Sequence, residues 1–157
     1  MAEAPAVNSS PIIALAATGH IHILRLAAPE IVVTRSVVAE IRDKRSLEIL
    51  QTTDWLRKVP DTAMPDSIRS LDLGAGEKSV LAWAAAYPGT DVILDDKAAR
   101  RCALGLGLRV RGTLGLVLLA KKKRVIPVAR PLLEQLRTEG LFLSDKLMNQ
   151  TLALVGE

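Results

Sequence analysis

The chain has 157 residues, of which 49% are hydrophobic and 3% aromatic, and its net charge is +4. This length and composition fit one globular domain and exclude a disordered chain. The scarcity of aromatic side chains argues against a protein that binds nucleic acid by stacking bases on exposed rings. A single cysteine, Cys102, excludes an internal disulfide.

The same features bear on where the protein works. No apolar run approaches the roughly 20 residues of a membrane span, and Met1 to Pro5 lack the basic start of a signal peptide. We therefore expect a soluble, cytoplasmic protein with no membrane partner. Residues 97–157 hold 12 Lys and Arg against 4 Asp and Glu, whereas residues 1–96 hold 9 against 13. An acidic part beside a basic part suits a polyanionic substrate, although a solvated basic surface gives the same count.

The first part of the chain alternates short strands and helices. Residues 6–7 predict a strand, and Ser10 followed by Pro11 predicts a helix start with Ser10 as the N-cap. Gly19 interrupts this helix, and a second short helix is predicted at 21–27. The alternation of elements begins within the first thirty residues.

The next part is less regular. Residues 30–34 are rich in β-branched side chains and predict a second strand, and Ser36 predicts the cap of the helix that follows. Residues 43–70 have the weakest pattern. Within them, 46–56 favours a helix, and two prolines then indicate a loop.

The second half of the chain again alternates. Strands are predicted at 91–94 and 108–110, and helices at 74–84, 97–104, 114–120, 131–136 and 145–155. Strands that are short and apolar, with helices between them, are typical of a parallel sheet covered on both faces. The predicted fold class is therefore α/β.

Oxygen-bearing side chains stand at four strand ends or helix starts. The clearest are Asp95 and Asp96, which directly follow the apolar run 92–94. In open α/β folds ligands bind beyond the carboxyl ends of the strands, and two adjacent carboxylates repel each other unless a cation or a donor lies between them. The other three places hold Asn8, Glu40 and Glu77.

Each of these residues also has a simpler explanation. Asn8 suits a turn, Glu40 could pair with Lys44, Glu77 suits a first helical turn, and one aspartate of the pair could cap the next helix. These simpler explanations are less convincing together, because they require four independent coincidences at the same end of a sheet. Carboxylate and amide oxygens are ligands for hard cations such as Mg²⁺, and such ions supply an activated water and stabilise the leaving oxygen in phosphodiester hydrolysis.

Four segments together resemble the PIN domain, and most closely a prokaryotic branch related to the VapC toxins. They are NSSPIIAL at 8–15, LGAGE at 73–77, ILDDKAAR at 93–100 and GTLG at 112–115. The resemblance runs from about Val7 to Glu157 and implies a single domain over residues 1–157. It implies a three-layer α/β/α fold with a mostly parallel sheet, and a Mg²⁺- or Mn²⁺-dependent ribonuclease of the toxin–antitoxin type. VapC-like proteins are usually homodimers and are inhibited by a small DNA-binding antitoxin.

The resemblance also assigns roles by position. Catalytic roles fall on Glu40, Glu77, Asp95 and Asp96. Metal ligands are expected at Asn8, Glu77, Asp95 and Asp96. Polar side chains that border the site are expected at Ser10 and Thr113. From the basic second half of the chain, rather than from the resemblance, we expect Arg100, Arg111 and Lys121 to hold RNA phosphates.

Asn8 is the departure from the family pattern, because the family has its first aspartate at this position. An amide oxygen can bind Mg²⁺ but brings no charge, so metal binding and water activation should be weaker. An alternative function is therefore a non-catalytic RNA-binding or regulatory PIN-like module. A phosphoryl-accepting receiver is disfavoured, since receivers carry an acidic pair after the first strand, where Asn8 stands here.

Overall fold

The computed structural model describes residues 3–157; Met1 and Ala2, part of the segment judged for a signal peptide, lie outside the described residues. A five-stranded sheet forms the centre, in the order β3-β2-β1-β4-β5, and all pairings are parallel. The strands are β1 (Ala6–Val7), β2 (Ile31–Thr34), β3 (Leu56–Val59), β4 (Val92–Ile93) and β5 (Val110–Arg111). The predicted α/β class with a parallel sheet is confirmed.

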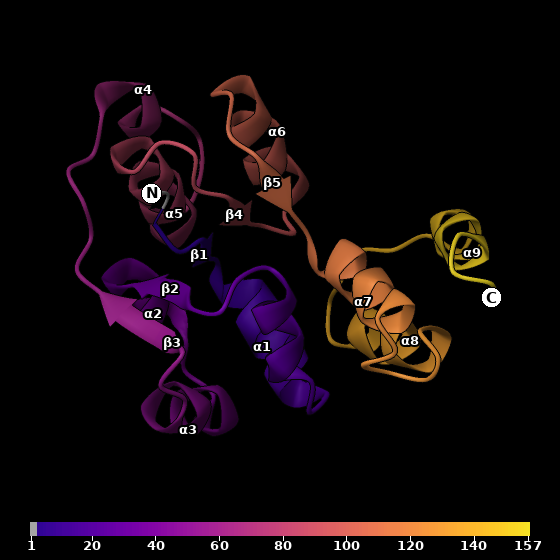
Figure 1. Ribbon diagram of the computed structural model, residues 1–157. Coiled ribbons are helices and arrows are strands. Elements are labelled where there is room, and N and C mark those ends of the chain that lie inside the picture. The colour runs from indigo at the N-terminus through magenta and orange to yellow at the C-terminus, as the bar shows by residue number, and fades with distance from the viewer. Residues whose placement is uncertain (1–2) are drawn as a thin grey trace.

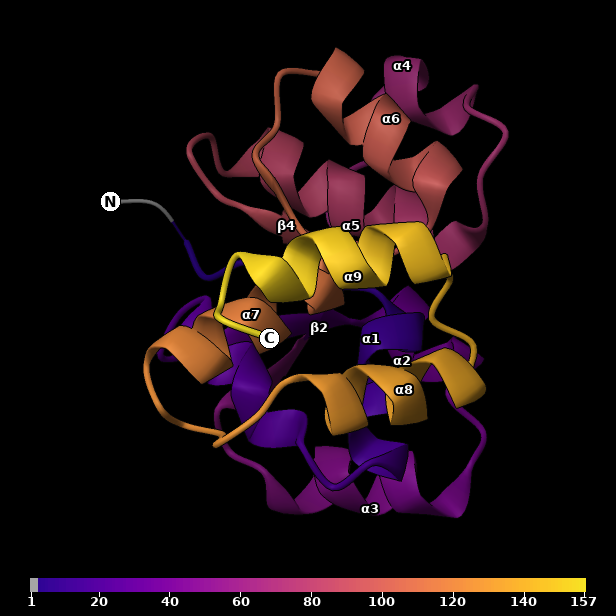
Figure 2. The same ribbon diagram turned by 90° about the vertical axis from the view of Figure 1, so that its right-hand side faces the viewer.

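Helices cover both faces of this sheet, as Figures 1 and 2 show. On one side lie α4 (Asp66–Arg69), α5 (Ala75–Ala86) and α6 (Lys97–Gly105). On the other lie α1 (Ser9–Ala17), α3 (Lys44–Thr52), α7 (Thr113–Lys122) and α8 (Arg130–Thr138). The remaining elements are the 3₁₀ helix η1 (Ile21–Leu26), α2 (Arg35–Glu40) and α9 (Asp145–Ala153). The three-layer α/β/α fold is confirmed.

The order of the strands decides where a ligand can bind. From β1 the chain moves outward through β2 to β3, then crosses back and adds β4 on the other side of β1. This reversal makes a topological switch point between β1 and β4, whose carboxyl ends lie side by side. In open parallel sheets, ligands bind in the crevice at such a point. Both strands are completely buried, so the helices that follow them start from a rigid edge.

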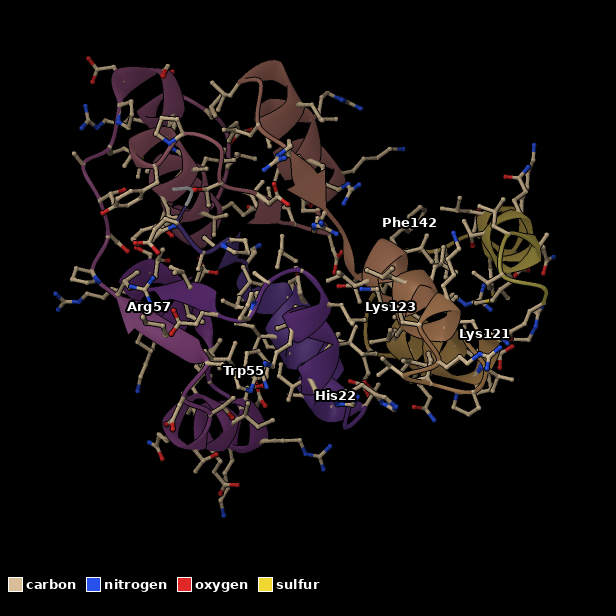
Figure 3. The ribbon with its side chains drawn as sticks, viewed as in Figure 1. His22, Trp55, Arg57, Lys121, Lys123 and Phe142 are labelled. Carbon is tan, nitrogen blue, oxygen red and sulfur yellow. The ribbon has the colours of Figure 1, made fainter. Side chains whose placement is uncertain are left out.

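Strand β3 was not predicted, and the helix expected at 46–56 ends at Thr52. Two basic residues, Arg57 and Lys58, interrupt the apolar pattern of this strand. They are tolerated because β3 is an edge strand, and charges on an edge also discourage pairing with other chains. Arg57, labelled in Figure 3, lies 2.7 Å from a carboxylate oxygen of Glu3.

Two predicted helix caps were wrong by two residues. The N-cap position of α1 is Asn8, without a capping hydrogen bond from its side chain, rather than Ser10. Helix α2 is capped by Thr34, whose hydroxyl accepts the N–H of Val37 at 3.3 Å, rather than by Ser36. In both cases the helix begins directly at the strand end, with no intervening turn. The Ser144 hydroxyl accepts the N–H of Leu147 at 3.1 Å and caps α9. None of the helices within residues 3–157 is long and apolar enough to cross a membrane.

The side chain of Glu157 caps α8. Its Oε2 accepts the N–H of Ala129 at 2.7 Å and its Oε1 accepts that of Arg130 at 3.1 Å, while Lys121 Nζ lies 3.5 Å from Oε2. Burial raises the pKa of Glu157, but these two N–H groups and the Lys121 charge outweigh it, so the pKa is lowered. The contact is therefore fully formed at neutral pH.

Replacing Glu157 with alanine should lower the free energy of unfolding by about 1 kcal/mol, because two N–H groups at the helix start lose their acceptor. Because the folded-state pKa is lowered, this contribution is present above the unfolded pKa and is lost as pH falls through the folded pKa. Urea unfolding at pH 7 and at pH 3 measures both effects. Glu134→Ala, an exposed change on the same helix, is the control; an equal loss in both variants contradicts the capping role.

Candidate active site

Asn8 stands at the switch point between β1 and β4. Its backbone N–H donates to the carbonyl oxygen of Ile93 at 3.1 Å, which ties the end of β1 to β4. The Asn8 side chain is 5% exposed, and its Oδ1 is buried without a hydrogen-bond donor among the described residues. A buried carbonyl oxygen without a donor is costly unless a ligand or an ion satisfies it.

Asp95, just beyond β4, is held by the start of α7. Its Oδ1 accepts the backbone N–H of Thr113 at 2.7 Å, and its Oδ2 accepts the Thr113 hydroxyl at 2.5 Å. Arg100 lies beside it, with one guanidinium N–H on the carbonyl oxygen of Leu94 at 2.8 Å. A side chain at Gly112 would collide with this guanidinium, so glycine allows the close approach.

Glu40 is bound to the start of α5. Its Oε1 accepts the backbone N–H of Gly76 at 2.8 Å, and its Oε2 accepts the hydroxyl of Ser9 at 3.0 Å. A carboxylate at a helix N-terminus is favoured by the helix dipole. The simpler explanation of Glu40, a pair with Lys44, does not hold, because Lys44 lies 4.0 Å from Glu48 instead.

A pair of buried hydroxyl groups holds the start of α5, which Glu40 contacts. Thr34 Oγ1 and Ser79 Oγ are 2.7 Å apart, and the Ser79 hydroxyl donates to the carbonyl oxygen of Gly76 at 2.6 Å. The first turn of α5 is therefore fixed to the end of β2. This fixes the direction from which Glu77 enters the site.

Glu77 and Asp96 are the carboxylates with unused oxygens. Glu77 Oε1 accepts the N–H of Gly74 at 3.2 Å, but its Oε2 is buried without a donor in the described residues. Asp96 caps α6 through its Oδ2, which accepts the N–H of Ala99 at 2.9 Å. Burial raises the pKa of Glu77; the Gly74 N–H opposes this, and the negative charges of Asp96 and Glu40 raise it further.

These polar groups at the switch point of an all-parallel sheet agree with a comparison against known families. The sequence matches the family DUF3368, described as a PIN domain, over residues 5–157. The chain belongs to the PIN domain family. A comparison with curated proteins found no match. PIN domains are generally nucleases that act on nucleic acids with divalent metal ions.

Some side-chain oxygens of the candidate PIN site accept hydrogen bonds from the protein, and others do not. Within residues 3–157, no three side chains of the His, Cys, Asp and Glu types come close enough together to hold a metal ion. Two of the four carboxylates, Glu40 and Asp95, are already bound to donors of the protein itself. Asn8 Oδ1 and Glu77 Oε2 fit a cation, because both are buried oxygens without donors. Mg²⁺ commonly takes one or two carboxylates and keeps several waters, so a large protein ligand set is not required.

Three other predicted residues form no side-chain hydrogen bond with Asn8 or the four carboxylates within residues 3–157. Ser10 is exposed, and the neighbouring Ser9 contacts Glu40 instead. Arg111 Nε lies 3.0 Å from Asp91 Oδ2. Lys121 Nζ lies 3.0 Å from the carbonyl oxygen of Pro127, and its Cα is about 12 Å from that of Thr113 along the axis of α7. Figure 3 shows Lys121 in the part of the molecule formed by α7–α9.

The contact between Gly76 and Glu40 gives a test with a change of sign. A Cβ at Gly76 would lie 2.5 Å from Glu40 Oε2 and 2.6 Å from Oε1. Gly76→Ala should therefore displace the Glu40 carboxylate and lower the free energy of unfolding by about 1 kcal/mol. In a Glu40→Ala background the same change should raise it by about 0.5–1 kcal/mol, because alanine is the better helix former. Urea unfolding of the four proteins measures this, and the same sign in both backgrounds excludes the contact.

Proposed function

We propose that this PIN domain is a metal-dependent endoribonuclease of the VapC toxin type that works in the cytoplasm. Two buried oxygens without donors carry the proposal: Asn8 Oδ1 at the sheet's switch point, and Glu77 Oε2 in the first turn of α5. Oxygens of this kind are preferred by Mg²⁺ and Mn²⁺. The pKa of Glu77 is raised by burial and by neighbouring carboxylates, so a cation would relieve both costs.

The residues would divide the work as follows. Asn8, Glu77 and Asp96 would hold a divalent ion, and the ion would supply an activated water and stabilise the leaving oxygen of an RNA phosphodiester. Asp95, oriented by both donors of Thr113, would complete the acidic site. Glu40 would act as a positioning residue, since both of its oxygens are bound to the protein and fix the start of α5. Arg100, beside Asp95, would meet a phosphate.

Cleavage of single-stranded RNA tests the proposal. Purified protein should cut a set of unstructured RNAs when Mn²⁺ or Mg²⁺ is present, and a chelator should stop the reaction. Expression should inhibit growth if the protein is of the toxin type. A protein that leaves all these RNAs intact at millimolar Mn²⁺ would falsify the nuclease proposal.

The second candidate is an RNA-binding or regulatory module without catalysis, and Asn8 favours it. An amide at this position brings one negative charge fewer than the aspartate of the family pattern. The module would bind RNA with a strong dependence on salt but release no products. RNA binding without cleavage in Mn²⁺ supports this candidate, and products that disappear with a chelator exclude it.

A homodimer and a small DNA-binding antitoxin complete the proposal. The partner contact would involve the α8–α9 segment, where the apolar side chains of Phe142, before α9, and Leu154, after it, are 88% and 75% exposed. Figure 3 shows Phe142 in this part of the molecule. Light scattering of wild type and Phe142→Ser measures the oligomeric state, and a wild-type monomer at high concentration contradicts the dimer.

A further inference from the structure

The end of α7 carries four consecutive basic residues with two different environments. Lys121 is 24% exposed in its side chain and is held by Pro127 and Glu157. The next three, Lys122, Lys123 and Arg124, are exposed, and none of them forms a salt bridge within residues 3–157. The charge of these three side chains is therefore available to a partner.

Two of these side chains border a concave surface. Lys122 and Arg124 line a hollow of about 570 Å³, and the adjacent Val125 lines a second hollow of about 640 Å³ together with His22 and Arg25 of η1. Helix α7 and η1 contact each other, although they are far apart in sequence. We call Lys122, Lys123 and Arg124 the basic end; Figure 3 labels Lys123 and, on η1, His22. Burial and the charge of His20 lower the pKa of His22, so the positive charge here at neutral pH comes from Lys and Arg.

The backbone at Arg124 is unfavourable for its own residue type. Arg124 has φ 59°, and among the residues described it is the only one other than glycine with a positive φ. It follows the C-cap of α7, where its N–H donates to the carbonyl oxygen of Lys121 at 3.1 Å and that of Val125 donates to Ala120 at 2.8 Å. Glycine is usual at this position of the motif, and strained non-glycine residues often mark ligand sites. An arginine here suggests a role for the side chain beyond ending the helix.

We propose that the basic end is a second contact for an RNA strand, separate from the acidic site. For its connection to cleavage, the inference rests on the proposed nuclease function. Lys122 lies about 14 Å along α7 from Thr113, which holds Asp95. A stacked strand with the roughly 3.4 Å rise of one duplex strand needs about four nucleotides to reach both places. The substrate class is therefore single-stranded RNA longer than a few nucleotides, attracted by the basic end and cut at the acidic site.

RNA binding in the presence of a chelator tests the inference without cleavage. The variant Lys122→Gln/Lys123→Gln/Arg124→Gln should bind a 20-nucleotide RNA about tenfold more weakly at low salt, and the slope of log K against log salt should fall by about 2. The control Lys44→Gln/Lys58→Gln/Lys146→Gln removes the same charge from other exposed positions and should bind within twofold of wild type. Equal losses in both variants overturn the inference, because they show an effect of net charge alone.

Single changes at Arg124 separate binding from folding. Arg124→Gly should raise Tm by about 2–4 °C, because it removes the strain, and should weaken RNA binding. Arg124→Lys should keep both the strain and the binding. A higher Tm with unchanged RNA affinity in Arg124→Gly shows that the arginine only ends the helix. Unchanged RNA affinity in the triple variant, with loss of binding to poly-glutamate, shows instead that the basic end binds an acidic protein.

The experiment distinguishes this inference from the proposed nuclease function. If the protein cuts RNA, the triple variant should raise KM for the 20-nucleotide RNA at unchanged kcat, and leave cleavage of a trinucleotide unchanged. If the protein cuts nothing but the triple variant still binds RNA more weakly than the control, the nuclease proposal fails and the second contact stands. If the triple variant cleaves and binds RNA as wild type does, the second contact fails and the nuclease proposal stands.

Discussion

Replacing Glu77 with glutamine should reduce Mn²⁺-dependent RNA cleavage at least about a hundredfold, and should also make the metal-free protein more stable at neutral pH. The activity falls because the buried Oε2 loses its charge, and a change beside a metal already costs about 10- to 100-fold. Stability rises because burial and the charges of Asp96 and Glu40 oppose the ionised Glu77 carboxylate. The two effects have opposite signs, which a merely structural role would not give.

The pH dependence of stability follows from the same carboxylate. The pKa of Glu77 is raised in the folded protein from its ordinary value of 4.5. A raised pKa contributes stability that is fully present below the unfolded pKa and is lost as pH rises through the folded pKa. In metal-free protein, Glu77→Gln should therefore gain most over wild type at neutral pH and least near pH 4.

Thermal unfolding with and without Mn²⁺ measures these effects without relying on cleavage. Wild type should gain stability on addition of Mn²⁺, by about 2.7 kcal/mol at a concentration 100 times Kd, and Glu77→Gln should lose most of this gain. Glu134→Gln, exposed on α8, is the matched control. An identical Mn²⁺ response in wild type and Glu77→Gln removes Glu77 from the ligand set.

Replacing Asn8 with aspartate should strengthen Mn²⁺ binding about tenfold or more and increase cleavage. The change adds one negative charge at a buried oxygen that has no donor of its own, and an opposite charge close by is the main source of cation affinity in such a site. In the absence of metal the variant should be less stable than wild type at neutral pH, because a buried carboxylate without a partner is costly.

The control for Asn8→Asp is Gln150→Glu, which makes the same amide-to-acid change at an exposed position of α9. Mn²⁺ titration followed by thermal unfolding gives the affinity, and RNA cleavage gives the activity. Tighter metal binding without cleavage favours the non-catalytic module. Metal affinity that does not change from wild type to Asn8→Asp places the ion away from Asn8.

Much of the fold could be predicted from local patterns. Strands β1, β2 and β4 are buried runs whose apolar side chains are visible in the sequence, and the Asp95–Asp96 pair marks the end of β4 directly. The edge strand β3 could not be predicted, because the charged residues Arg57 and Lys58 interrupt the apolar pattern of a strand. Such charges are tolerated at the edge of a sheet.

The internal contacts of the site could be predicted less well. Glu40 and Gly76 are 36 residues apart, and only the packing of α2 against α5 brings them together. The contact of Ser9 with Glu40 could not be predicted either, because the two residues are 31 positions apart in the sequence. The sequence instead favoured the neighbouring Ser10, as a helix cap. The residue types at the switch point were readable from the sequence, whereas the division into bound and unbound oxygens depends on tertiary hydrogen bonds.

Helix α7 has a consequence for how the protein would select RNA. Leu116, Val117 and Ala120 on its inner face are buried, so the helix is packed against the core. Its first residue holds Asp95, and the basic end begins at its last residue, Lys122. The separation between the two is therefore set by a count of residues in one rigid rod. With this fixed separation, the protein would select RNA strands by their length and not by their base sequence.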